Sequence, residues 1–260
     1  MKPFDKRHSI YERQFFQRLI KFFREVANAI TFGLLTESNA ESVIGLYFSE
    51  SQLRSILLNT QLSIGDRYGK IVGKELNRAF GKEGFKYPLF SEKFQKDLIK
   101  YYDDFGGENI KLLSETYTKA VVAEIRKATE LGESLDQMQK RIQKVVKSPK
   151  FYKYEALRIA RTETTFAMNS AKQMTGEVSG FILEKVWSSD LSIRRRVFHG
   201  YEMNNKFIGQ NELFTVEGEK LSFPGDKLNG ATAKNLINCR CSYGYRGKRD
   251  KDGKLIYINI

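Results

Sequence analysis

Apolar residues recur at helical spacing through most of the first 177 residues, and this pattern stops near Gly180. From Ser9 to about Phe32, aromatic and aliphatic side chains return every three or four residues, which is the period of an amphipathic α-helix. Ser9-x-x-Glu12 fits a capping box at the start of that helix. Such a wide apolar stripe serves either a core helix, or a helix that docks on a partner or on a membrane surface.

The same spacing, read together with capping and breaking residues, predicts further helices. We expect them at residues 49–80, 93–102, 108–130, 135–146 and 152–177. Ser134 is expected to cap the helix that begins at Leu135, and Leu131-Gly132 is expected to end the helix before it. The N-terminal region is therefore predicted to be mostly α-helical.

Short apolar pieces separated by turns follow Gly180. A strand is expected at residues 181–187, and Asp252-Gly253 is a hairpin signal near the end of the chain. These patterns predict an α+β fold. It would have a helical docking region at residues 1–132 and a small α+β domain, with helices followed by short strands, at residues 133–260.

The net charge of the chain indicates which classes of partner it can attract. The chain has 44 Lys and Arg against 31 Asp and Glu, and its net charge of +13 indicates attraction to polyanions, either nucleic acid or acidic protein surfaces. The charged first residues do not resemble a secretory signal, and no apolar run approaches the roughly 20 residues of a membrane span. We therefore expect no membrane span and a protein that is made and used in a cytoplasm.

Both cysteines of the chain lie close together, at Cys239 and Cys241. In an extended segment, residues i and i+2 face the same way, so both thiols would face one point. Zinc takes four ligands, usually Cys and His, and His199 is the obvious third, with Asp226 or a water as the fourth. The alternative is that the two cysteines are small buried apolar residues.

Few other residues are candidates for a catalytic or ligand-binding role. Glu163 is either a general acid/base or a residue whose hydrogen bonds, with those of Arg161, join its helix to the C-terminal strands; no second carboxylate sits at helical spacing to complete a hydrolytic pair. The run Arg194, Arg195 and Arg196 is either a solvated turn or a contact for nucleic acid or a protein partner. Neither a Gly-rich phosphate loop nor a Gly-x-Ser-x-Gly motif is present, so we expect no enzymatic activity and no catalytic residue.

Several of these residues form an ordered series: Ala160-Arg161-Thr162-Glu163, Val186-Trp187, Arg196-x-x-His199, Pro224-Gly225-Asp226 and Asn238-Cys239-Arg240-Cys241. In order and spacing, the series resembles the C-terminal domain of the phage Mu F-like family of minor head, or head morphogenesis, proteins. The resemblance covers roughly residues 133–245 and is strongest from Arg158 onward. The family's usual Asp before the Arg-x-x-His step is absent here, so no catalytic role for that Asp carries over.

The resemblance implies a structural minor head, or minor capsid, protein of a tailed bacteriophage that acts in head assembly at or near the portal. Its expected partners are the portal and major capsid proteins of the same phage, and double-stranded packaged DNA without sequence preference. It would be found in the host cytoplasm during assembly and then in the virion head. The alternatives are a nuclease or ADP-ribosyltransferase-like effector, and a nonspecific DNA-binding protein unrelated to heads.

Overall fold

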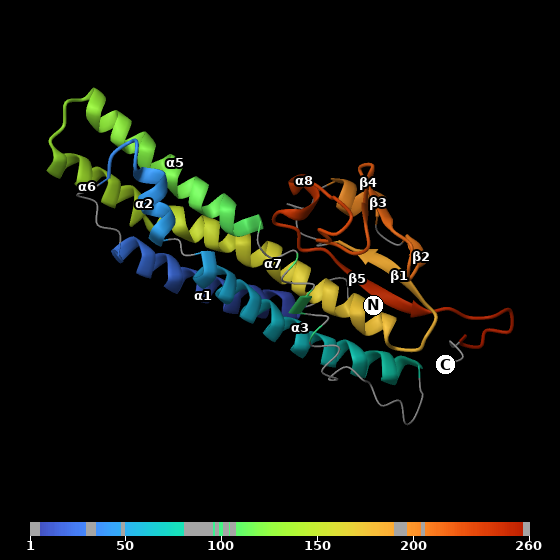
Figure 1. Cartoon of the computed structure of the whole chain (residues 1–260). Helices are drawn as coiled ribbons and strands as arrows, with labels where there is room; N and C mark the ends of the chain where they lie inside the picture. The colour runs from blue at the N-terminus through green and yellow to red at the C-terminus, as the bar shows by residue number, and fades with distance from the viewer. Residues whose placement is uncertain are drawn as a thin grey trace. The chain divides into compact units, whose positions relative to one another are not determined.

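The computed structural model describes residues 6–29, 35–47, 50–80, 96, 99–100, 104, 108–189, 197–203 and 206–256. Over these residues the chain has the predicted α+β fold, with helices in the N-terminal part and short antiparallel strands in the C-terminal part (Figure 1). None of the described helices is both long enough and apolar enough to cross a lipid bilayer. Most of the helix predicted at 93–102, and the whole arginine run at 194–196, lie outside the described residues.

The chain forms two compact units. The C-terminal unit comprises Met1–Glu12, Thr60–Phe105 and Arg161–Ile260, and the helical unit comprises Arg13–Asn59 and Gly106–Ala160. Three long helices supply residues to both units: α1 (Lys6–Ala29), α3 (Glu50–Phe80) and α7 (Pro149–Glu177). The predicted boundary between residues 132 and 133 stays a prediction.

The helical unit adds α2 (Ala40–Tyr47), α5 (Glu108–Glu130) and α6 (Leu135–Val146) to its parts of the long helices. α5 packs against both α2 and α6. Large aromatic side chains fill the core, where the ring of Phe23 stacks on that of Tyr117 at a centroid distance of 5.9 Å. Phe15, Leu19 and Phe22 on α1 are also buried, so the apolar stripe of α1 serves as a core face.

Capping and helix-breaking residues predicted several helix boundaries correctly. α5 and α6 begin and end at the predicted residues, and Ser134 and Gln137 form a reciprocal capping box at the start of α6. α7 begins at Pro149, three residues earlier than predicted, because proline suits the first turn of a helix. The capping box predicted at Ser9 is wrong: α1 already begins at Lys6. The short helix α2 was not predicted.

A three-stranded antiparallel sheet is the centre of the C-terminal unit. β1 (Leu183–Ser188) lies between β2 (Phe207–Gly209) and β5 (Ser242–Gly247), and Trp187 pairs with Tyr243. β1 corresponds to the strand predicted at 181–187. The remaining elements are a hairpin of β3 (Phe214–Val216) and β4 (Glu219–Leu221), a π-helical turn η2 (Phe198–Glu202) and the short helix α8 (Ala233–Leu236).

The C-terminal half of α7 lies along this sheet (Figure 1). Lys172 on α7 donates a hydrogen bond to the carbonyl of Tyr243 on β5, and Gly176 leaves room for the ring of Tyr245. Beyond β5, residues 248–256 form the tail hairpin, in which Arg249 pairs with Leu255. Gly253 has φ +78°, which places the turn where Asp252-Gly253 predicted it.

Candidate metal site

His199, Cys239 and Cys241 come together in the C-terminal unit, although 40 residues separate the first two. Nδ1 of His199 lies 3.7 Å from Sγ of Cys239 and 3.5 Å from Sγ of Cys241. The three ligand atoms all lie within 4.8 Å of one another, and all three residues are buried. This cluster can hold a metal ion, as the sequence predicted.

The distances fit a tetrahedral ion. With metal–sulfur bonds of about 2.3 Å and metal–nitrogen bonds of about 2.0 Å, tetrahedral angles place the nitrogen roughly 3.5 Å from each sulfur. The two observed distances are 3.7 and 3.5 Å. The nitrogen–sulfur distances therefore match a tetrahedral site, whereas the two sulfurs, which lie within 4.8 Å of each other, must be roughly 3.8 Å apart when both bind one ion.

Backbone geometry brings the two thiols to one point. Asn238 adopts φ +58°, a left-handed conformation that Asn tolerates better than most residues, and this turns the chain into the Cys239–Cys241 segment. The amide of Cys241 then donates to Sγ of Cys239 at 3.4 Å. His199 lies in the π-helical turn η2, a rare backbone form that is often found at functional sites.

A hydrogen-bonded chain sets the tautomer of His199. Nε2 of His199 lies 2.9 Å from Oδ1 of Asn235, while Nδ2 of Asn235 donates to Glu219 at 2.8 Å. Because the amide oxygen of Asn235 only accepts, Nε2 of His199 must carry a hydrogen, so Nδ1 is the nitrogen that binds a metal when the imidazole is neutral. Metal-binding histidines are typically held in this way by a partner behind the ring.

Electrostatic interactions favour the thiolate form of Cys239. Hydrogen bonding from the Cys241 thiol, together with His199, holds the pKa of Cys239 well below its ordinary value in spite of burial. The thiolate is the form of cysteine that binds metal. Behind His199, burial acts to raise the pKa of Glu219, but hydrogen bonds from Thr232 and Asn235 outweigh this effect and lower that pKa.

Apolar side chains enclose the two sulfurs. Trp187 stands edge-on to His199 at 5.5 Å, and Phe214, Leu236 and Met203 belong to the same buried cluster as the cysteines. A thiolate beside an imidazole is also the arrangement of a cysteine nucleophile. Such a nucleophile must be reached by its substrate, so the burial of Cys239 and Cys241 favours metal binding over nucleophilic catalysis.

Asp226, considered as a fourth ligand from the sequence, has a different role. Its carboxylate accepts hydrogen bonds from the amides of Ser222 and Leu228 and from the side chain of Asn229. Gly225 before it has φ +85°, and a Cβ there would lie 3.1 Å from Thr165. The Pro224-Gly225-Asp226 segment is therefore a tight turn packed against α7, where only glycine fits without strain.

Polar side chains of α7 hold the cysteine segment in place. Thr165 donates its hydroxyl hydrogen to the carbonyl of Cys239. Asn169 donates to the carbonyls of Cys241, at 3.0 Å, and of Pro224, at 2.8 Å. Thr162 accepts a hydrogen bond from the amide of Asn238 at 3.1 Å. The threonine of the Arg-Thr-Glu motif thus binds the turn that presents the cysteines.

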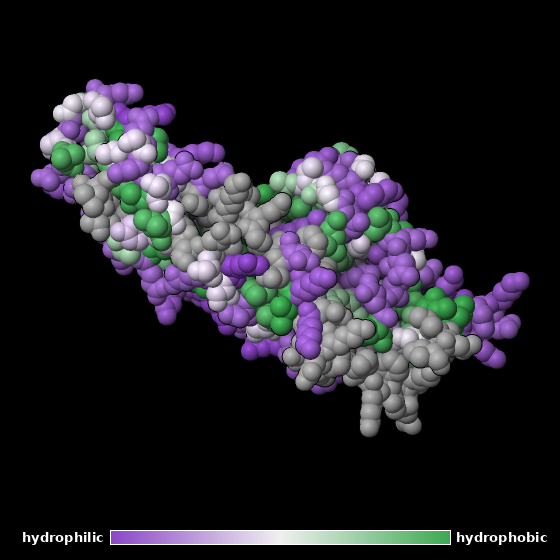
Figure 2. All heavy atoms as spheres, in the orientation of Figure 1, coloured by the Kyte–Doolittle hydropathy of each residue, from purple (hydrophilic) through white to green (hydrophobic). Residues whose placement is uncertain are grey.

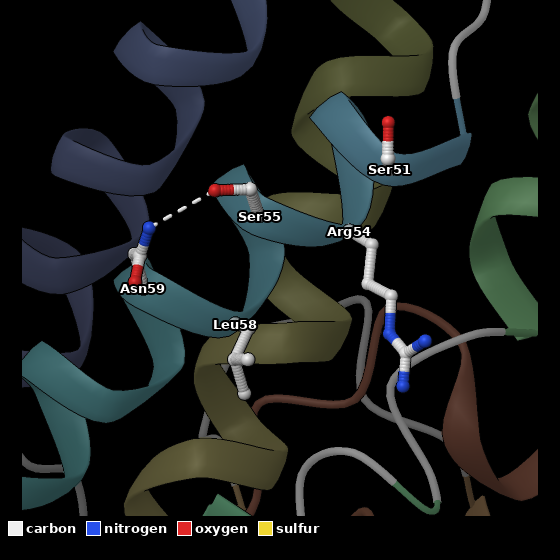
Figure 3. A pocket seen from close by; sticks show the side chains of 5 residues that line it. All are labelled: Ser51, Arg54, Ser55, Leu58 and Asn59. Carbon is white, nitrogen blue, oxygen red and sulfur yellow. Dashed lines mark hydrogen bonds between the residues drawn. The ribbon is translucent and has the colours of Figure 1, made fainter.

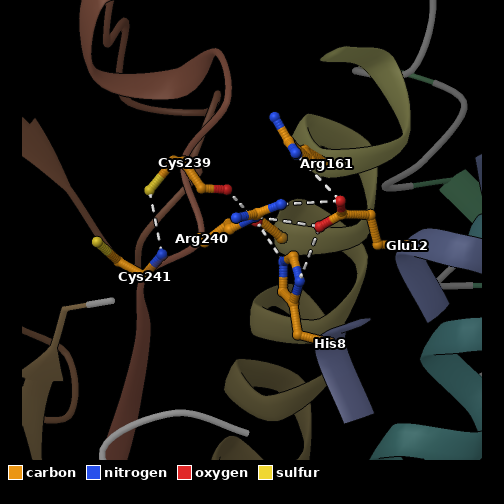
Figure 4. A network of polar contacts seen from close by, with 7 residues as sticks. His8, Glu12, Arg161, Cys239, Arg240 and Cys241 are labelled. Atoms are coloured by element: carbon orange, nitrogen blue, oxygen red, sulfur yellow. Dashed lines mark hydrogen bonds and ion pairs between the residues drawn. The ribbon is translucent and has the colours of Figure 1, made fainter. Parts of the chain in front are cut away.

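Glu12 of α1 organises a second network next to this segment (Figure 4). Its carboxylate accepts hydrogen bonds from Arg161 on α7, at 3.0 Å, and from Arg240 between the two cysteines, also at 3.0 Å. Nε2 of His8 lies 2.8 Å from Thr165 and donates to it, because the hydroxyl hydrogen of Thr165 is already used. Arg161 therefore bonds to α1 rather than to the C-terminal strands, and sequence reasoning missed Glu12.

Glu163 is fully buried on another side of α7. One carboxylate oxygen accepts from Nζ of Lys227 at 2.8 Å, and the other accepts a short hydrogen bond from Gln61 on α3. Nζ of Lys227 also lies over the ring of Phe166, 5.1 Å from its centroid. The glutamate of the motif therefore ties α3 and the 222–229 turn to α7.

Lys185 on β1 gives the C-terminal unit a pH dependence that we can predict. Its side chain is buried and donates to the carbonyl of Ser222 at 2.7 Å, and burial lowers its pKa to about 8, against the opposing attraction of Asp226. In the unfolded chain a lysine has a pKa of about 10.4, so between these values the unfolded state binds more protons and stability rises with pH. We expect Lys185→Met to remove that rise.

The measurement is urea unfolding at about pH 7.5 and about pH 9.5 for wild type and Lys185→Met. Lys220→Met, on exposed Lys220 of β4, is the control and should keep the wild-type dependence. An equal rise in stability in wild type and Lys185→Met would show that other groups cause it.

A separate hollow lies beside α3 within the helical unit (Figure 3). Described residues that line it come from one stretch of that helix: Ser51, Arg54, Ser55, Leu58 and Asn59. Nδ2 of Asn59 donates to Ser55 at 3.1 Å. These residues include no carboxylate, thiol or imidazole, so they provide neither a metal ligand nor an acid/base group.

The structure thus places the predicted residues in one unit, except Arg194, Arg195 and Arg196, which lie outside the described residues. Asn235 and Glu219, behind His199, were missed because no local motif marks them. Comparison of the chain with protein-family models, with curated proteins and with solved structures finds no match.

Proposed function

We propose that this chain is a structural minor head protein of a tailed bacteriophage. It would act in head assembly at or near the portal, with the portal and major capsid proteins as partners and with packaged DNA nearby. It would be found in the host cytoplasm during assembly and in the virion head afterwards. This proposal rests on the resemblance of the Arg161–Cys241 motif series to the Mu F-like family.

The contacts among the motif residues support the proposal. Thr162 binds the turn at Asn238, Arg161 and Arg240 share Glu12, and Trp187 packs against His199. Residues that are far apart in the sequence therefore act together in one small unit, as expected if the series marks a domain. The roles these contacts support are structural, because both oxygens of Glu163 are engaged within the unit.

We also propose that the metal at His199, Cys239 and Cys241 is zinc, with water as its fourth ligand. Two thiolates and one imidazole are a donor set that zinc prefers, and the burial of all three residues favours a structural role. Bound zinc would link η2 to the cysteine segment and so stabilise the unit. No step of a reaction is assigned to it.

Particle composition tests the head-protein role. We expect the chain to co-purify with the portal protein and with procapsids of the same phage, and quantitative mass spectrometry of mature virions should give a fixed low copy number. Loss of the gene product should reduce the yield of DNA-filled heads. Absence of the chain from both procapsids and virions would refute the proposal, and a screen for nuclease activity with Mg²⁺ would then come next.

A further inference from the structure

A row of exposed cations follows one face of α3 in the C-terminal unit. Its members are Arg67, Lys70, Lys74 and Arg78. Their spacing is i, i+3, i+7 and i+11, which keeps them within about 80° of arc on a helix with 3.6 residues per turn. At 1.5 Å per residue the row is about 16 Å long. These four residues are called the α3 basic row.

Nearby carboxylates neutralise little of this charge. Asp66 pairs with Lys70 at 2.9 Å, and Glu75 pairs with Arg7 of α1 at 3.0 Å. Arg67, Lys74 and Arg78 form no ion pair among the described residues. The row therefore keeps a local excess of positive charge at the surface, where it attracts anions from solution.

The opposite face of α3 anchors the row. Ile64, Tyr68, Val72 and Leu76 are buried, and Lys172 of α7 lies over the ring of Tyr68 at 5.5 Å. The cations are thus held on a packed helix rather than on a loop. A rigid base lowers the entropy cost of binding an extended partner.

The row lacks the features of a protein-docking surface. None of the exposed large apolar side chains among the described residues lies on α3. Protein interfaces usually have an apolar or aromatic centre inside a polar rim, whereas surfaces that bind nucleic acid are polar and positively charged. The composition of the row therefore favours a nucleic acid over an acidic protein.

The tail hairpin adds further cations beside the C-terminal end of α3. Phe80 of α3 and Leu255 of the hairpin both pack over Gly247, which brings the two elements together. Lys248, Lys251 and Lys254 of the hairpin are exposed, and the hairpin carries hydrophilic side chains in Figure 2. The hairpin also exposes two carboxylates, Asp250 and Asp252, so its cations add only a small net positive charge near this end of α3.

We propose that the α3 basic row binds the phosphate backbone of double-stranded DNA without sequence preference. Duplex DNA carries one negative charge per roughly 1.7 Å of its axis, so a row about 16 Å long faces several phosphates at once. The two arginines can each bind a phosphate through two N–H groups, and the lysines act as point charges. The proposal assigns the DNA contact to a specific surface of the chain. The role of this contact in a phage head rests on the proposed function.

The test is DNA binding by the full-length protein, measured by fluorescence anisotropy on a duplex across a range of salt concentrations. The row variant is Arg67→Gln/Lys74→Gln/Arg78→Gln. The control is Lys140→Gln/Lys144→Gln/Lys147→Gln, which removes two exposed lysines of α6 and the exposed lysine that caps its C-terminal end, and leaves the same net charge. Both variants should keep the wild-type melting temperature, because the altered side chains are exposed.

For the row variant we expect the slope of log K against log salt to become less steep by about 2.7, since each lost phosphate contact contributes about 0.9. Affinity at about 0.1 M salt should fall on the order of 100-fold. The control should bind nearly as well as wild type, and Arg67→Lys/Arg78→Lys, which keeps the charge, should retain most of the affinity.

Three results would overturn the proposal. They are wild-type protein that does not bind DNA, an equal loss in the row variant and the α6 control, or a row variant that loses binding to poly-glutamate but not to DNA. The head-protein role is measured separately by virion composition. The chain can therefore be present in particles without binding DNA through the α3 basic row, or it can bind DNA through the row and be absent from particles.

Discussion

One zinc ion per chain is the expected result of metal analysis on the purified protein, and its removal is expected to lower the melting temperature. Free zinc at 1,000 times its dissociation constant stabilises the folded state by about 4 kcal/mol, because it binds the folded chain and not the unfolded one. For a chain of this size, that free energy corresponds to a change on the order of 10 °C in melting temperature. The effect should be reversed when zinc is returned after chelation.

Substitutions locate the metal. Cys239→Ser, Cys241→Ser and His199→Gln should each lose most of the bound zinc, and cobalt-substituted wild type should show thiolate-to-metal charge-transfer absorption that the cysteine variants lack. His8→Gln is a matched control, since His8 is the other buried histidine and contacts Thr165 instead of the cysteines. It should keep its zinc. Metal content well below one per chain, with unchanged melting after chelation, would exclude the site.

The buried pair of Glu163 and Lys227 is expected to give the largest loss of stability from a single substitution. Glu163→Ala would leave the ammonium of Lys227, whose side chain is only 8% exposed, without its counter-charge. Removing one partner of a buried ion pair costs about 3–5 kcal/mol, mostly because the remaining charge stays desolvated. It would also take away the acceptor of the hydrogen bond from Gln61.

A double variant distinguishes the cost of burying an unpaired charge from the cost of losing the contacts of Glu163. Glu163→Leu/Lys227→Met, which removes both charges, should be more stable than Glu163→Ala in urea unfolding, because no unpaired charge is then buried. Asp66→Ala, at the exposed i,i+4 pair with Lys70, is the control and should cost less than about 0.5 kcal/mol. A cost for Glu163→Ala as small as that of Asp66→Ala would mean that the pair contributes little to the fold.

Much of the fold could be predicted from the sequence because the signals are local. The bounds of α5 and α6 follow from the cap at Ser134 and the turn at Gly132, which depend on backbone groups only a few residues away. The same holds for the turn of the tail hairpin at Gly253. The Ser9 capping box failed because α1 begins at Lys6, which places Ser9 inside the helix, and Glu12, its other member, binds Arg161 and Arg240.

The candidate metal site was predictable in part. The spacing of Cys239 and Cys241, and the single nearby histidine, pointed to the three residues that the fold brings together. The remaining structure around the site was not predictable. Asp226, a candidate fourth ligand, instead accepts three hydrogen bonds within its own turn, and the partner of His199 is Asn235 on α8.

By itself, the sequence determined most of the long helices, the change to short strands after Gly180 and the identity of the metal-binding candidates, because periodicity and caps act over a few residues. Only the tertiary structure decided which charges pair and which cations remain exposed. Glu12 and Arg240 are 228 residues apart, and Gln61 and Glu163 are 102 apart. Buried polar groups must find partners wherever the packed chain supplies them, so such pairs depend on the whole fold and leave no local pattern.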